Sequence, residues 1–302
     1  MSNKVKAGHK NSQSYANTRK TGKEQYYTSS DVVDYCIETV QEFITLKGKK
    51  ILEPAGGTGE FIKGFQRIGI PDNLILSYDI EPKHPMVKEG NYLETVFGDE
   101  FISITNPPFG RASSLAKRFF NHAAGHSSYI CYLIPRAWRK WSTKNSLNPY
   151  FHLVADVPVP QNCFYMSDGT TKKNNVLQTV FQIWEKRDYK REKILIPDHG
   201  LVQKIRPTKE KKVIGANVQL ILFGWSAGKV IEIQPLVNAV TTSMYLKVDD
   251  PKVIQALKDI DFSEHYKNVS TVYSLSLPEI NYELNKYFGL KNYNFNSSAI
   301  VR

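Results

Sequence analysis

Hydrophobic residues follow two spacings along the first two thirds of the chain, and each predicts its own kind of element. Intervals of three and four residues, following a serine that can cap a first turn, predict helices. Short continuous apolar runs predict buried strands. The expected elements are, in order, helix 30–46, a strand ending at 52, helix 57–68, strands 74–78 and 101–105, helix 113–124, and strands 128–134, 152–157 and 176–184.

This alternation of strands and helices predicts an α/β fold. Strands joined through helices pair in parallel, and both faces of the resulting sheet are covered. The last two strands surround a polar loop and are expected to form a terminal hairpin. Ligands of such sheets bind at the carboxyl ends of the strands, so the turns that follow the strands are where chemistry is expected.

Two other regions flank this α/β domain, which is expected over residues 25–186. Residues 1–24 are polar, with six Lys or Arg against one Glu, and predict a basic flexible arm. Residues 187–302 predict a small second α+β domain, after a basic junction. Its expected elements are strands 229–233 and 243–248 and helices 251–260 and 278–288.

Composition narrows the partners and the compartment. The chain has 302 residues, and 40 Lys and Arg against 29 Asp and Glu give a net charge of +11, which favours a polyanionic partner or a membrane surface. No apolar run is long enough to span a membrane, and the N-terminus lacks an apolar signal core. The three cysteines have neither disulfide nor zinc spacing. A reducing compartment is expected, cytoplasmic or nucleoid-associated, without secretion or a membrane.

A glycine-rich turn follows the first predicted strand. The sequence from Glu53 to Phe61 reads Glu-Pro-Ala-Gly-Gly-Thr-Gly-Glu-Phe, so a strand ends in an acid and a glycine turn opens a helix. Glycines let the backbone approach a nucleotide-like ligand without obstruction by a Cβ atom. The order GxGxxG is absent, which disfavours a nicotinamide dinucleotide. Asp79 ends the next strand and can accept both hydroxyls of a ribose, although a strand-end turn residue alone would be unremarkable.

The most specific signal is Asn106-Pro107-Pro108-Phe109, directly after an apolar strand. Two prolines fix the backbone and remove donors, so carbonyl oxygens point outward beside the amide of Asn106. An exocyclic amine needs two acceptors, which the Asn106 side chain and the Pro107 carbonyl can supply. Phe109 can stack on the ring that carries the amine. A plain Pro-Pro turn is the competing interpretation.

These motifs resemble those of the S-adenosylmethionine-dependent amino methyltransferases, above all the N6-adenine DNA methyltransferases with the gamma-type motif order. The resemblance covers residues 24–186 and extends to residues 25–29, Gln-Tyr-Tyr-Thr-Ser, with Ser29 where the family usually has proline. It implies a class I, Rossmann-like sheet of seven mostly parallel strands, followed by a target-recognition domain over residues 187–302. It implies S-adenosylmethionine as cofactor, bound by Tyr27, Thr28, Glu53, Pro54, Gly57, Gly59, Phe61, Asp79, Ile80, Asn91, Tyr92 and Asn106. The tail and the region of Arg136 also look like a phage or large-virus branch of this family.

The chain departs from the family pattern at two places. Asn91 stands where the family usually has an aspartate that binds the cofactor adenine, so this contact would lack a charge. The aromatic residue that would sandwich a flipped target base is represented by Phe164, with Tyr165 as the alternative.

A long basic stretch surrounds the Asn-Pro-Pro-Phe turn. Residues 101–155 contain seven Lys or Arg and neither Asp nor Glu. Aromatic residues alternate with the later charges, an arrangement that can track phosphates while stacking bases. The expected nucleic-acid contacts are Arg111, Arg136, Arg139, Lys140 and Lys144. Trp138 and Trp141 are as well explained by packing as by base stacking. His122 and His126 share a predicted helix face but have no third ligand, so no metal site is expected.

The sequence therefore predicts transfer of a methyl group from S-adenosylmethionine to the N6 amine of adenine in DNA, with the base flipped into the Asn106 pocket. Methylation of adenine in RNA is the first alternative. A nucleic-acid-binding subunit that kept the fold without catalysis is the second. A homodimer or another protein subunit is compatible with either, because spacing does not record oligomeric state.

Overall fold

The computed structural model describes residues 27–160, 164–165, 177–269, 272–295 and 300–301. The predicted arm, Gln25, Tyr26 and Cys163 lie outside these ranges. The largest element is an eight-stranded sheet in the order β16-β7-β9-β6-β5-β2-β3-β4. Its strands are β2 (Ile51–Glu53), β3 (Ile75–Asp79), β4 (Val87–Glu89), β5 (Phe101–Thr105), β6 (Ser127–Pro135), β7 (Phe151–Pro158), β9 (Thr179–Lys186) and β16 (Ile300–Val301).

One strand of this sheet runs against the others. β9 is antiparallel to both neighbours, β6 and β7, whereas the remaining pairs are parallel. β7 and β9 form the antiparallel pair that the sequence predicted as a terminal hairpin, with residues 159–178 between them. The arrangement confirms the predicted class I methyltransferase fold. β16 adds an eighth strand at the edge.

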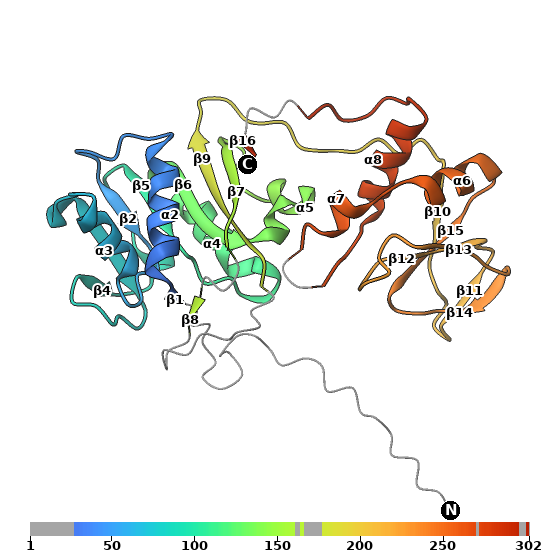
Figure 1. Ribbon diagram of the computed structural model, residues 1–302, viewed down its shortest axis with the longest axis horizontal. Helices are drawn as coiled ribbons and strands as arrows, with labels where there is room; N and C mark the ends of the chain where they lie inside the picture. The colour runs from blue at the N-terminus through green and yellow to red at the C-terminus, as the bar shows by residue number, and fades with distance from the viewer. Residues whose placement is uncertain (1–26, 161–163, 166–176, 270–271, 296–299, 302) are drawn as a thin grey trace, which may run out of the picture.

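Helices cover both faces of the sheet because successive strand residues point to opposite sides. Ile51 belongs to the core beneath α2 (Ser30–Gln41) and α3 (Glu60–Arg67), and the next residue, Leu52, belongs to the core beneath α4 (Ser114–Ala123). Figure 1 shows these helices against the sheet. The central strand β5 is buried at all five positions, as its apolar run predicted.

Two helix boundaries differ from the expectation. α3 begins at Glu60 rather than at residue 57, because Gly57 and Gly59 have φ angles of 47° and 77°, outside the right-handed helical region. α2 ends at Gln41 rather than near 46. Phe43 and Ile44 nevertheless contact the core, which explains why the apolar spacing continued past the helix.

A second, four-stranded antiparallel sheet follows β9, in the order β10-β15-β12-β13. Apolar residues of β12 and β15 pack against α6 and α8 in a core of their own. After α8 the chain returns to the first sheet as β16. The elements are β10 (Gln203–Ile205), β11 (Lys212–Ile214), β12 (Val218–Ile221), β13 (Val230–Glu232), β14 (Leu236–Asn238), β15 (Ser243–Lys247), α6 (Pro251–Asp259), α7 (Ser263–Tyr266) and α8 (Leu277–Tyr287).

None of the helices in the described ranges has the length and apolar character that crossing a membrane requires.

Candidate active site

The glycine turn between β2 and α3 is fixed by backbone contacts to the end of β3. Gly56 N–H donates to the Tyr78 carbonyl at 2.9 Å, and Gly57 N–H donates to Asp79 Oδ2 at 2.9 Å. A Cβ atom on Gly56 would lie 2.1 Å from Ser77 Oγ, so this approach requires glycine. The turn and the acid after β3, identified separately in the sequence, therefore form one unit.

Asp79 is oriented by two backbone donors. Its Oδ2 accepts from Gly57, and its Oδ1 accepts from Glu81 N–H at 2.8 Å. Each carboxylate oxygen has further acceptor capacity. The predicted role in binding a pair of ribose hydroxyls is thus compatible with these contacts.

Glu53 is a carboxyl group buried beside the cavity, with 1% of its surface exposed. Burial raises its pKa to about 8, although the hydrogen bond from Ser77 Oγ to Glu53 Oε2, at 3.0 Å, lowers it; Asp79 and Glu60 raise it further. This carboxyl group is therefore largely protonated at physiological pH, and a cation bound beside it would favour its ionised form, because the opposite charge offsets the cost of a buried carboxylate.

The Asn-Pro-Pro-Phe turn begins where β5 ends. Asn106 Nδ2 donates to Thr28 Oγ1 at 3.2 Å, so a residue far away in sequence fixes which end of the amide is the nitrogen. The Phe109 carbonyl accepts from Leu115 and Ala116 N–H at 3.2 and 3.3 Å, which joins the turn to α4. The turn is thus held from both sides.

Thr28 belongs to β1 (Tyr27–Thr28), which pairs with β8 (Phe164–Tyr165). Tyr165 Oη and Thr58 Oγ1 are hydrogen-bonded at 3.0 Å, which ties this two-stranded sheet to the glycine turn. The Phe164 ring lies edge-on to Phe109, with centroids 6.3 Å apart and planes at 77°. The structure therefore brings the two predicted stacking residues together, although Phe164 is not among the cavity-lining residues.

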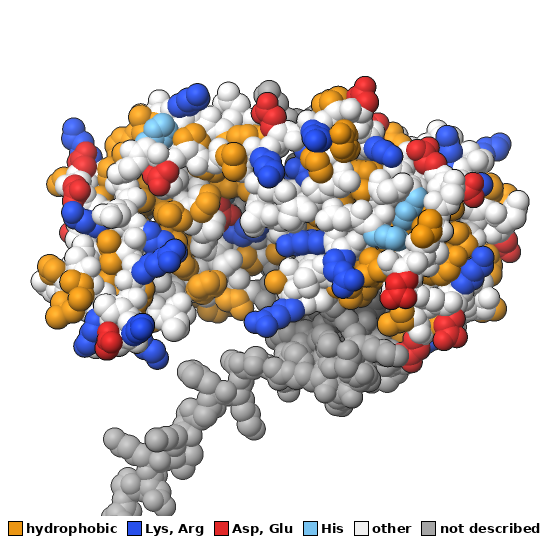
Figure 2. Space-filling model, turned by 180° about the vertical axis from the view of Figure 1, so that it is seen from behind, with side chains coloured by type: hydrophobic (Ala, Val, Ile, Leu, Met, Phe, Trp, Pro, Cys, Tyr) orange, Lys and Arg blue, Asp and Glu red, His pale blue; other side chains and the backbone are white. Residues whose placement is uncertain are grey.

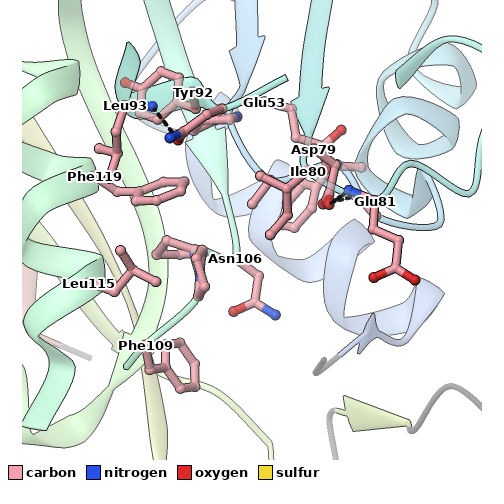
Figure 3. Close-up of a pocket in the computed structure, with 18 of the residues that line it drawn as sticks. Glu53, Asp79, Ile80, Glu81, Tyr92, Leu93, Asn106, Phe109, Leu115 and Phe119 are labelled. Atoms are coloured by element: carbon pink, nitrogen blue, oxygen red, sulfur yellow. Dashed lines mark hydrogen bonds between the residues drawn. The ribbon is translucent and has the colours of Figure 1, made fainter. Parts of the chain in front are cut away.

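These turns line a cavity of about 540 Å³, and in Figure 3 Asn106 lies between Phe109 on one side and Asp79 on the other. This volume is in the range of small-molecule sites. Every predicted cofactor residue except Gly59 lines it, together with Pro107, Pro108 and Phe109. Gly59 instead has a positive φ, and a Cβ atom there would lie 2.4 Å from the His84 side chain. Glycine is therefore required at this position by the conformation of the turn and its packing against His84.

Asn91, the departure from the family pattern, is engaged within its own turn. Its Oδ1 accepts from Leu93 N–H at 3.2 Å, and its Nδ2 donates to Glu94 Oε1 at 2.6 Å. Neighbouring Tyr92 is buried, and its hydroxyl is hydrogen-bonded to His126 Nε2 at 2.9 Å. The structure thus gives Asn91 a capping role at the wall of the cavity.

His122 and His126 pack around Tyr92 and Phe97 as aromatic rings. Burial, with a contribution from His122, lowers the pKa of His126 to about 4, so this ring is neutral at physiological pH. Within the described ranges, no group of three or more His, Cys, Asp or Glu side chains could hold a metal ion.

Several lining residues escaped the sequence reasoning. Leu115, Arg118 and Phe119 project from one side of α4 toward the cavity, and Leu93 and Glu81 complete its walls. The spacing of three and four residues on α4 was the available signal, because such residues share a helix face. Arg118 is exposed at the cavity and adds a positive charge there.

The basic stretch divides into two groups. Arg139 donates from Nε and Nη2 to buried Asp156 at 2.7–3.1 Å, and Lys140 Nζ donates to buried Glu279 at 2.7 and 3.0 Å. Burial also lowers the pKa of Lys144. Arg139 and Lys140 thus occupy ion pairs within the protein, which makes them unsuitable for the expected phosphate contacts, whereas Lys144 is partly buried and its phosphate contact stays a prediction.

The other group remains at the surface. Arg111 is exposed near the start of α4, and Arg136 is half-buried, with Nη1 donating to Gln178 Oε1 at 2.9 Å. Figure 2 shows Lys and Arg side chains across the middle of the opposite face of the molecule. Arg118 lines the cavity and Arg111 directly follows the lining residue Gly110, so these two exposed side chains leave positive charge beside the cavity.

No protein-family model and no curated protein matches the chain. Solved structures match about half of it. A protein from Pyrococcus horikoshii assigned as an RNA methyltransferase is 16% identical, with a TM-score of 0.42 over 54% of this chain and 87% of its own. A modification subunit assigned to a type I restriction enzyme of Vibrio vulnificus is 16% identical, with a TM-score of 0.40 over 56% and 46%.

The M protein of the type I restriction enzyme EcoKI is 15% identical, with a TM-score of 0.40 over 54% of this chain and 44% of its own. The match therefore spans less than half of each of these two restriction-enzyme subunits. These likenesses concern the fold.

Proposed function

We propose that this protein transfers a methyl group from S-adenosylmethionine to the N6 amine of adenine in DNA. The observation that carries the proposal is that Asn106 and the glycine turn line the same cavity, next to Asp79 and Glu53. The residues proposed to bind the cofactor and the turn proposed to bind the target amine therefore line one cavity. The amide, prolines and aromatic ring match what an exocyclic amine on a planar base needs.

The cavity contains residues suited to the ribose, the amino-acid end and the purine of S-adenosylmethionine. Asp79 offers carboxylate oxygens for ribose hydroxyls, and Glu53 offers a buried acid for the positively charged amino-acid end. Ile80, Leu93 and Phe119 supply apolar walls for a purine. When bound, the sulfonium supplies an already activated methyl group, so the protein has only to orient the amine and stabilise the charge that develops on its nitrogen.

Within this proposal, Asn106 Oδ1 accepts a hydrogen from the target amine and the Pro107 carbonyl accepts the other. These contacts pull the nitrogen lone pair out of conjugation with the ring and aim it at the methyl group. Phe109, supported edge-on by Phe164, stacks on the extruded base. Stacking of this kind contributes roughly 1–3 kcal/mol, comparable to the cost of extruding a base.

The test is transfer of tritiated methyl groups from S-adenosylmethionine to unmethylated duplex DNA, single-stranded DNA and RNA, with the products digested to nucleosides. The expected product is labelled N6-methyldeoxyadenosine. Label in RNA alone would assign the cavity to an RNA methyltransferase. Cofactor binding without label in any polymer would contradict a nucleic-acid substrate, and the absence of cofactor binding would favour a non-catalytic subunit.

Binding of the cofactor should release a proton from Glu53. With a pKa of about 8, this carboxyl group is protonated in the free protein at about pH 6.5, and a positively charged ligand favours its ionised form. The pKa in the complex is then lower, so affinity should rise as the pH increases toward 8 and level off above it. Calorimetry in two buffers of different ionisation enthalpy should detect release of roughly one proton at about pH 6.5.

Glu53→Gln is the matched control, because glutamine keeps the shape and the acceptor but has no proton to lose. Its binding should lack this proton release and the rise of affinity with pH. Equal release by both proteins would show that Glu53 does not face the charged part of the cofactor.

Thr28 is expected to act as a positioning residue for Asn106. Thr28→Val removes the oxygen that accepts from Asn106 Nδ2 while keeping a β-branched side chain. A misoriented amide should lower kcat roughly 10- to 100-fold, with a smaller change in the cofactor dissociation constant. Thr28→Ser retains the acceptor and should restore most of kcat. A Thr28→Val enzyme with normal kcat would remove Thr28 from this role.

A further inference from the structure

The turn between β12 and β13 presents an exposed tryptophan. Trp225 is 94% exposed, and Phe223 beside it is 42% exposed. The other three tryptophans differ: Trp138 and Trp184 are fully buried, and Trp141 stacks on Phe295. Large aromatic side chains normally bury most of their area, so two exposed aromatic residues together in one turn draw attention to this surface.

The turn that carries Trp225 has a backbone fixed by two glycines and a hydrogen bond. Gly224 and Gly228 have φ angles of 82° and 90°, which other residues rarely adopt. Gly228 N–H donates to the Ile221 carbonyl at 2.8 Å, closing the turn, and Ala227 is buried beneath it. The backbone thus holds Trp225 outward in a defined position.

A second segment supports the turn from the side. Gly224 N–H donates to the Tyr273 carbonyl at 3.3 Å, and the Trp225 and Tyr273 rings meet edge-on with centroids 5.9 Å apart. Tyr266 of α7 packs on Tyr273 in turn, at 5.2 Å. Trp225 therefore stands at the end of a row of aromatic rings, which we call the aromatic row (Trp225, Tyr273 and Tyr266).

The aromatic row is joined to the edge of the sheet where the cavity opens. Lys140 Nζ donates to the carbonyl of Ser274, next to Tyr273, at 2.9 Å. Lys140 directly follows the short 3-10 helix Arg136–Arg139, which starts at the carboxyl end of β6. β6 is the neighbour of β5, whose carboxyl end carries Asn106. In Figure 1, β12 and the chain before α8 lie on the side of the second sheet that faces the first.

Lys and Arg residues occur in the segments between the carboxyl end of β6 and the turn that carries Trp225. Arg136 is within electrostatic reach of Tyr273: burial lowers the pKa of Arg136, and the tyrosine acts in the opposite direction. Lys229 follows the turn and Lys267 follows α7, both exposed, whereas Asp261 and Glu264 are the acids on the α7 side. An exposed indole with the exposed Lys229 four residues away in the same turn is a combination that can bind a nucleobase and a phosphate.

We propose that Trp225 stacks on a nucleobase of the same nucleic acid whose adenine enters the Asn106 cavity. This inference rests on the proposed function, because it takes the polymer to extend from the cavity past Arg136. Trp225 supplies affinity away from the reacting base and sets where the strand or duplex is held. Its indole face accepts any base, so the contact adds affinity without reading sequence.

The experiment measures binding of a fluorescently labelled, adenine-containing oligonucleotide as duplex DNA, single-stranded DNA and RNA. Wild type, Trp225→Ala and Trp225→Phe are compared, with Leu236→Ala as a matched control, since Leu236 is 62% exposed on β14. Stacking is worth about 1–3 kcal/mol per base, so Trp225→Ala should bind roughly 5- to 150-fold more weakly. Trp225→Phe should be intermediate, and Leu236→Ala should bind like wild type.

Tryptophan fluorescence gives a direct readout, because Trp225 is the solvent-exposed tryptophan. Nucleic acid should quench wild-type emission, and most of this quenching should be lost in Trp225→Phe. Unchanged affinity and quenching in the variants would overturn the stacking proposal, even if the wild type methylates DNA. Sedimentation that shows a wild-type dimer and a Trp225→Ala monomer of equal affinity would also overturn it, by assigning the turn to a contact between copies.

The two proposals fail in different ways. A wild-type protein that binds nucleic acid through Trp225 but labels no polymer would retain the stacking contact and refute methyl transfer. A wild-type protein that labels DNA while Trp225→Ala binds normally would do the reverse. Absence of any nucleic-acid binding would overturn both.

Discussion

Asn106→Ala should abolish most methyl transfer, although the protein should still bind the cofactor. Alanine removes the oxygen that would accept from the target amine, and removal of one such preorganised polar contact costs about 100- to 1,000-fold in kcat. Because the methyl donor is already activated, orientation and charge stabilisation are the main contributions left for the protein to make. The loss should therefore appear in kcat, measured at saturating DNA and cofactor.

The control is Asn121→Ala. Asn121 is exposed on α4 and is not among the cavity-lining residues, so this variant should have wild-type activity. Calorimetric binding of S-adenosylmethionine to Asn106→Ala checks that the cavity is intact. An Asn106→Ala protein with normal kcat would mean that the reaction takes place elsewhere.

Lys140→Met should strongly destabilise the protein. Lys140 Nζ donates to both oxygens of Glu279, which is 3% exposed, and to two carbonyl groups of the segment around α7. Removing one partner of a buried pair leaves an uncompensated charge and typically costs 3–5 kcal/mol, so the free energy of unfolding should fall by about that amount. Urea denaturation followed by circular dichroism measures the change.

An exposed ion pair provides the comparison. Lys258 and Glu232 pair at the surface, with 39% and 60% of their side chains exposed, so Lys258→Met should change the free energy of unfolding by about 0–1 kcal/mol. Adding Glu279→Gln to Lys140→Met removes the stranded charge and should recover part of the loss. Equal effects of Lys140→Met and Lys258→Met would show that the Lys140 contact is not a buried one.

The sequence predicted the elements whose signals are local. β5 has all five positions buried, and the turns at Gly57 and Pro107 contain residues whose backbone behaviour is intrinsic, because glycine is unusually free and proline is restricted. That these two turns line one cavity could be expected, because the carboxyl ends of parallel strands meet at one edge.

The features that the sequence did not predict depend mainly on contacts between residues far apart in the chain. Arg139 and Lys140 looked like a basic surface, because nothing local shows that their partners, Asp156 and Glu279, lie in other elements. The three-residue strands β11 and β14 have too few apolar positions to register as a pattern. The donor to Thr28 comes from 78 residues further along the chain.

The return of the chain to the first sheet has a mechanical consequence. β16 follows the second sheet and its helices along the chain and pairs with β7 of the first sheet. The second sheet is therefore connected to the first through the chain at both of its ends. A domain joined by one linker can rotate about that linker. A domain joined by two chain segments loses most of this rotational freedom even in the absence of a ligand. A polymer that bridges the cavity and Trp225 would then sacrifice less rigid-body entropy on binding than it would with a hinged pair of modules.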